Sequence, residues 1–99
     1  MSWASQYIQV LQSGKTCQFR PVGHSMTGRI NHKDLVTVTP IIEELQVDDV
    51  VLVKVKGAVY LHLIKAMQGD RLLIGNNRGG VNGWTTKKQV FGKVVKIEK

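Results

Sequence analysis

Hydrophobic residues near the N-terminus recur at helical spacing: Trp3, Tyr7, Val10 and Leu11, with Ala4 and Ile8 beside them. This spacing predicts a short helix over residues 1–14 with one apolar face. Ser2 is the expected N-cap and Gly14 the expected C-terminal stop. A helix this short is not stable alone in water, so we expect it to dock with its aromatic stripe facing the core.

Beyond Gly14 the spacing changes to the alternation of β-strands. Residues 75–83 contain four glycines and three asparagines and are predicted as loop. Lys56-Gly57 is predicted as a two-residue hairpin turn. Gly92 is expected to mark a bulge in the last strand. The predicted strands are Thr16–Val22 at an edge, Leu35–Thr39, Val50–Val55, Ala58–Ile64, Arg71–Ile74 and Val90–Ile97.

The fold class that follows is mostly β, a small coiled sheet or partly open β-barrel of about six strands with one short N-terminal helix. At 99 residues the chain is predicted to form a single domain over 1–99, because a second core would not fit.

Composition narrows the class of protein. No apolar run is long enough for a membrane span, and the N-terminus lacks the basic start of a signal peptide. The single cysteine, Cys17, excludes an internal disulfide and does not make a zinc site, so we expect no metal, no cofactor and a cytoplasmic location. The 14 basic and 7 acidic residues give a net charge of +7. This charge keeps nucleic acid as a less favoured partner, since the basic residues are scattered.

Two places could carry chemistry. In Gly23-His24-Ser25-Met26 a serine lies in a glycine-flanked loop, where its hydroxyl and nearby backbone N–H groups could serve acyl transfer. The common alternative is a local turn bond by that serine. His62 lies within the apolar segment AVYLHLI. It is either a hydrogen-bonded core histidine or a general base held in place by the strand.

The order of segments resembles the catalytic β-domain of the signal-peptidase and LexA-type-repressor superfamily of serine peptidases. The resemblance covers residues 22–97. Its most specific parts are Gly23-x-Ser25-Met26, the turn at Asp34, Val47-x-Asp49-Val50-Val51 and Gly92-Lys93-Val94.

The resemblance implies that Ser25 is the nucleophile and that His62 stands where many members carry a lysine base. Some members use histidine at this position together with an acid, but here no acid occurs between Asp70 and Glu98. Asn76 or Asn77 could orient the imidazole instead or line the groove with Met26. Asp34 matches a structural turn of the family. Lys65 is expected to face away from His62 unless the strand bulges.

The stretch before Ser25 supplies neither the membrane anchor of signal peptidases nor the DNA-binding domain of the repressors. We therefore expect a stand-alone soluble peptidase-like domain that cleaves a peptide or protein in trans. The alternatives are a catalytically silent peptide- or protein-binding module on the same fold and a basic nucleic-acid accessory protein. The oligomeric state is left open.

Overall fold

The computed structural model describes residues 3–21, 26–40 and 44–99. In chain order these form a helix, seven strands and one 3-10 turn. Their bounds are α1 (Ser5–Gln12), β1 (Cys17–Phe19), β2 (Leu35–Thr39), β3 (Val50–Val55), β4 (Ala58–Gln68), β5 (Arg71–Gly75), β6 (Val81–Thr86), η1 (Lys87–Gln89) and β7 (Val90–Glu98).

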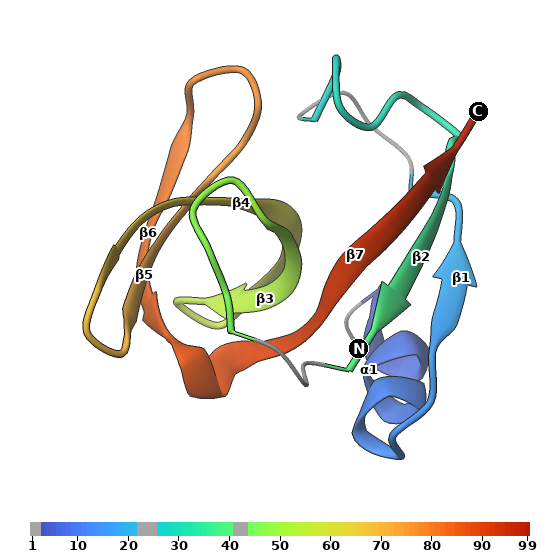
Figure 1. Cartoon of the computed structure of the whole chain (residues 1–99), viewed down its shortest axis with the longest axis horizontal. Helices are drawn as coiled ribbons and strands as arrows, with labels where there is room; N and C mark the ends of the chain where they lie inside the picture. The colour runs from blue at the N-terminus through green and yellow to red at the C-terminus, as the bar shows by residue number, and fades with distance from the viewer. Residues whose placement is uncertain (1–2, 22–25, 41–43) are drawn as a thin grey trace.

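All seven strands belong to one antiparallel sheet with the order β1-β2-β7-β3-β4-β5-β6. The long strand β7 joins its two halves, because its first residues pair with β3 and its last residues pair with β2. Figure 1 shows β3–β6 curled together on one side of the molecule and β1, β2 and α1 on the other. The sheet is therefore strongly coiled, with β1 and β6 as its two ends.

Side chains on the two faces of the central strands pack into two separate hydrophobic cores. Alternate residues of β3 point to opposite faces, and Val50 and Leu52 pack in the cluster that also holds Leu11 and Phe19. Val51, Val53 and Val55 pack in the second cluster, inside the curl of β3–β5. This double burial explains why VVLVKV is almost continuously apolar, as expected of a strand covered on both sides.

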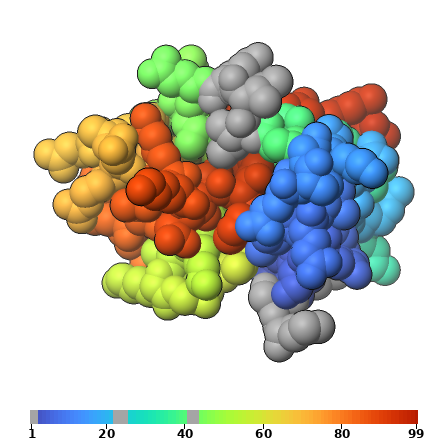
Figure 2. Space-filling view, turned by 90° about the horizontal axis from the view of Figure 1, so that it is seen from below, coloured from blue at the N-terminus to red at the C-terminus, as the bar shows by residue number. Residues whose placement is uncertain are grey.

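Helix α1 covers the first core and lies against β7. Ala4 is fully buried and Leu11 nearly so. Seen from below, the blue N-terminal segment lies beside the orange and red C-terminal segment (Figure 2). A Cβ atom at Gly92 would lie 2.7 Å from Val38 Cγ1 and 3.0 Å from Leu11 Cδ1. Glycine at this position therefore lets the helix and β2 approach β7 closely.

The predicted fold class is confirmed: a mostly β chain with one short N-terminal helix and an open, coiled sheet. Residues 35–39 and 50–55 are strands as predicted. Ser2 lies outside the described residues, and Ala4 occupies the N-cap position without a side-chain bond. The helix does end as predicted, with Gly14 at a φ of 87°.

One strand was missed by the sequence prediction. Residues 81–86, VNGWTT, form β6, although their glycine and asparagine were interpreted as loop. Pairing with β5 supplies the hydrogen bonds that these residues' low strand propensity does not favour. The expected bulge near Gly92 is present, since Leu52 pairs with Gly92 but Val53 pairs with Val90.

Candidate functional site

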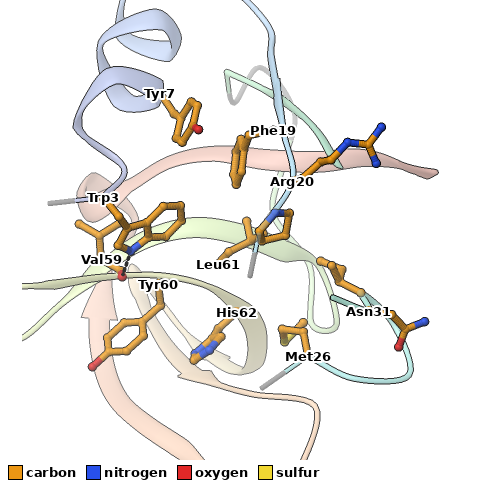
Figure 3. A pocket seen from close by; sticks show the side chains of 12 residues that line it. Trp3, Tyr7, Phe19, Arg20, Met26, Asn31, Val59, Tyr60, Leu61 and His62 are labelled. Atoms are coloured by element: carbon orange, nitrogen blue, oxygen red, sulfur yellow. Dashed lines mark hydrogen bonds between the residues drawn. The ribbon is translucent and has the colours of Figure 1, made fainter. Parts of the chain in front are cut away.

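A pocket of about 530 Å³ opens between the N-terminal segment and strand β4. Trp3, Tyr7 and Phe19 form an aromatic wall on one side, and residues 59–62 of β4 form the other. Figure 3 shows Trp3 near Val59 at one end and Met26 and Asn31 toward the other. The pocket is therefore mainly apolar, and Arg20, Asn31, Tyr60 and His62 contribute polar groups to its lining.

His62 is held by a hydrogen bond that crosses the curl of the sheet. Its Nδ1 lies 2.6 Å from Oδ1 of Asn82 on β6, although β5 separates β4 from β6 in the sheet order. The imidazole also stacks on Tyr60, with ring centroids 5.0 Å apart. Only 7% of the residue is exposed, so its ring orientation is fixed by packing as well as by the amide.

The Asn82 contact sets the tautomer of His62. An amide oxygen can only accept a hydrogen bond, so Nδ1 carries the proton and Nε2 carries the lone pair of the neutral ring. Burial lowers the pKa of His62 from its ordinary value of 6.5, and the hydrogen bond to Asn82 opposes that shift. Neutral imidazole is therefore favoured at physiological pH, which is the form a general base needs.

Met26 is buried and lines the same pocket as His62. Ser25, the residue bonded to it in the chain, lies outside the described residues. The structure thus brings Met26 and His62 together, and Ser25 stays a prediction.

The two asparagines predicted to orient the imidazole make other hydrogen bonds. Asn76 Oδ1 accepts the backbone N–H groups of Arg78 and Gly80, both at 2.9 Å, and so shapes the β5–β6 turn. Asn77 Nδ2 donates to the carbonyl of Thr27 at 2.8 Å. Asn77 therefore tethers the turn to the segment that follows Met26, and Asn82 supplies the amide beside His62.

Sequence reasoning missed Asn82 because residues 75–83 were interpreted as loop. On a strand, alternate residues share a face. VNGWTT does not follow this rule throughout, because Gly83 pairs with Ile74 and Val81 with Gly75, which makes Asn82 the extra residue of a bulge. Recognition of the segment as a strand would therefore not by itself have placed the Asn82 amide beside His62.

One stretch of the β4 backbone has no neighbouring strand among the described residues on the side away from β3. β5 pairs with β4 only from Leu63 onward. Residues 58–62 pair with β3 on their other side and have no second partner strand in the described ranges. The indole Nε1 of Trp3 donates to the carbonyl of Val59 at 3.3 Å. We call this backbone, from Val59 to Leu61, the open edge; it forms one border of the pocket.

In the comparison with protein families, the model for Peptidase S24-like proteins matches residues 2–95. The chain belongs to the Peptidase S24-like family. The comparison with curated proteins gives no significant match. The family match confirms the predicted kinship with the signal-peptidase and LexA-type superfamily and makes the chain a module of peptidase fold.

Within this S24-like domain, two of the motifs that suggested the kinship meet in space. Asp49 and Lys93 form an ion pair at 3.5 Å, and Val51 pairs with Lys93 across β3 and β7. Asp49 also accepts the backbone N–H of Gln46 at 2.8 Å. The motif residues therefore fasten the turn before β3 to the middle of β7.

Asp34 closes a turn, as the resemblance implied. Its Oδ2 accepts the backbone N–H of Asn31 at 2.9 Å and the ammonium of Lys99 at 3.2 Å. The Asn31 bond, followed by Lys99, holds the pKa of the Asp34 carboxyl below its ordinary value. Asp34 therefore fastens the C-terminal residue to the turn that precedes β2.

Lys65 lies at a bulge, which is the exception that the sequence reasoning had left open. Ile64 pairs with Ile74 and Ala66 with Leu73, so Lys65 is the extra residue. Its side chain packs over Gly75, where a Cβ would lie 3.0 Å from Lys65 Cε. Lys65 is not among the residues that line the pocket of His62.

Three further features of the described residues complete the description. No three His, Cys, Asp or Glu side chains gather among them as a metal site. None of the helices described is long and apolar enough to cross a membrane. Cys17, on β1, is a half-buried thiol whose pKa is raised by burial.

Proposed function

We propose that this S24-like domain hydrolyses peptide bonds in trans, with Ser25 as nucleophile and His62 as general base. The observation that carries the proposal is the hydrogen bond between His62 Nδ1 and Asn82. This bond places the proton of the neutral ring on Nδ1 and the lone pair on Nε2, in a pocket that also contains Met26, the neighbour of Ser25. Family membership supports the same assignment.

The reaction proceeds by acyl transfer. The Ser25 hydroxyl attacks the substrate carbonyl while its proton passes to Nε2 of His62. The imidazolium then protonates the leaving amine as the C–N bond breaks, which yields an acyl-serine. Water then attacks the acyl carbon, and His62 again accepts the proton. The C–O bond to Ser25 breaks, His62 returns the proton to the Ser25 oxygen, and the carboxylic acid product leaves.

The substrate suited to this pocket is an extended peptide or protein segment. Backbone N–H and C=O groups along the open edge of β4 can pair with an added strand, and the apolar pocket can take one of its side chains. The lone Cys17 fits a reducing compartment such as the cytoplasm.

A second candidate is a catalytically silent module that binds the same kind of peptide. The observation that favours it is the amide of Asn82 beside His62 in place of a carboxylate. An amide orients the ring but does not stabilise the imidazolium charge that forms when the base accepts a proton. The nucleic-acid alternative rests on the net charge of +7 alone.

The test compares Ser25→Ala and His62→Gln with two controls, Ser13→Ala and His32→Gln, which alter an exposed serine and an exposed histidine. Proteins are incubated with a mixture of unstructured peptides, and products are identified by mass spectrometry. A peptidase loses all cleavage in the first two variants and keeps it in the controls. Cleavage that survives Ser25→Ala contradicts the proposal. Binding without cleavage by all five proteins supports the silent module.

A further inference from the structure

The open edge of β4 presents its backbone groups in a defined register. Ile64 exchanges hydrogen bonds with the segment before β3, donating to Asp49 at 3.0 Å and accepting from Asp48 at 2.8 Å. Because the backbone groups of an antiparallel strand alternate in direction, Val59 and Leu61 direct theirs to the opposite side. The Trp3 bond to the Val59 carbonyl agrees with this direction.

Trp3 occupies the part of this edge farthest from His62. The Val59 carbonyl accepts a hydrogen bond from the Trp3 indole. An incoming peptide would have to displace the indole in order to bond to this carbonyl. The backbone of Leu61 lies between this bond and His62. His62 follows Val59 by three positions along the strand, which corresponds to about 10 Å.

The indole is held firmly enough to act as a wall. It contacts Phe19 edge-on, with centroids 5.8 Å apart, and Tyr7 at 6.3 Å. The next residue, Ala4, is 0% exposed and starts the docked helix α1. Trp3 itself is 52% exposed and lies at the end of the pocket beside Val59 (Figure 3).

We propose that Trp3 is a specificity-determining residue that blocks the open edge of β4 at Val59. The site then accepts a peptide with an apolar side chain. Only about three peptide residues fit between the Trp3 indole and the scissile bond at His62. This inference rests on the proposed function, because it assumes that a peptide pairs with the open edge. It predicts cleavage near chain ends or in short peptides, whereas a groove open at both ends would accept interior bonds.

The test uses Trp3→Ala, which removes the wall, and Trp3→Phe, which keeps a ring but removes the N–H donor. Trp84→Ala is the matched control, because Trp84 is an exposed tryptophan on β6. The probes are acetylated and amidated Leu/Ala/Phe peptides of about three and about nine residues, lengths that respectively fit and exceed the edge. Cleavage positions are read by mass spectrometry, and affinities by the amide shift of Leu61 in NMR titrations.

Wild type and Trp84→Ala are expected to cut the long peptides near one end and to bind both lengths equally. Trp3→Ala is expected to cut interior bonds and to bind the long peptide about fivefold to tenfold more tightly, the effect of one or two added backbone hydrogen bonds. The cleavage pattern and long-peptide affinity of Trp3→Phe are expected to lie between those of wild type and Trp3→Ala. If Trp3→Ala does not fold, the comparison of Trp3→Phe with wild type replaces it.

The outcomes separate this inference from the function on which it rests. If no peptide of either length is cleaved or shifts Leu61, the proposed function fails, and the role of Trp3 fails with it. If peptides are bound or cleaved but wild type and the Trp3 variants show the same length dependence, the peptide site stands and the specificity role of Trp3 is overturned.

Discussion

The imidazole of His62 and the amide of Asn82 lie 2.6 Å apart although they belong to strands that are not neighbours in the sheet. The curl that carries β6 over β4 makes this contact possible. It fixes the side of the ring that carries the proton and buries the pair beside the pocket. Several measurable consequences follow from this relationship and from the packing around it.

Asn82→Ala removes the group that orients the base. One lost hydrogen bond costs about 1 kcal/mol, which corresponds to roughly a fivefold fall in kcat/KM for peptide cleavage. Thr86→Ala, an exposed change on the same strand, is the control and should leave kcat/KM unchanged. Equal activity of Asn82→Ala and wild type would show that packing against Tyr60 suffices to orient the ring.

The pH dependence of activity should report the lowered pKa of His62. Burial lowers this pKa from 6.5, so kcat/KM should fall only as the pH drops below that value. Asn82→Asp places a carboxylate beside Nδ1, which favours imidazolium and should move the inflection to higher pH. The inflection is measured from pH–rate profiles and from NMR titration of the His62 ring; an unchanged inflection in Asn82→Asp would refute the assigned contact.

The same shift predicts how stability varies with pH. Because the native pKa of His62 lies below the unfolded value of 6.5, the unfolded chain binds the proton first on acidification. The contribution of His62 to stability is therefore complete above pH 6.5 and is lost as the pH falls toward the native pKa. Urea unfolding at several pH values should show a smaller loss over this range in His62→Gln than in wild type.

The strands that sequence could predict are those with strong local character. Leu35–Thr39 and Val50–Val55 are rich in β-branched residues, and burial on one or both faces agrees with that preference. VNGWTT lacks this strong local preference for strand, and it forms a strand because it pairs with β5. Long-range pairing of this kind is not visible in a local window.

The residues of the candidate site also divide into those that local sequence could identify and those that depend on long-range structure. His62 could be chosen because an ionisable residue within AVYLHLI is conspicuous in sequence. Asn82 could not be chosen, because its role depends on the curl of the sheet. Trp3 was placed on a helix face by spacing, yet it precedes α1 and borders the pocket through its bond to Val59.

Asp34→Asn should reduce stability at neutral pH and flatten its loss in acid. The Asn31 N–H and Lys99 favour the ionised carboxyl and keep its native pKa below 3.8. This contribution is therefore present above pH 3.8 and is lost as the pH falls through the native pKa. Urea midpoints from pH 7 down to pH 2 measure the effect. Asp70→Asn, at an exposed turn, is the control and should retain the wild-type acid slope; a wild-type slope in Asp34→Asn would count against the Asp34 contacts.

Gly92→Ala tests whether the close approach of α1, β2 and β7 stabilises the fold. A Cβ at this position would meet Thr39 O at 2.8 Å as well as Val38 and Leu11, and none of these is the end of a long flexible side chain. Overpacking of this kind costs about 1–3 kcal/mol, measured as the free energy of unfolding in urea.

Val95→Ala, an exposed change on the same strand, should stay within about 0.5 kcal/mol of wild type. Wild-type stability of Gly92→Ala would mean that the helix can shift away from β7 at little cost. A loss confined to Gly92→Ala would instead establish the close packing of β2 and α1 on β7 as a requirement of the fold that positions the aromatic wall.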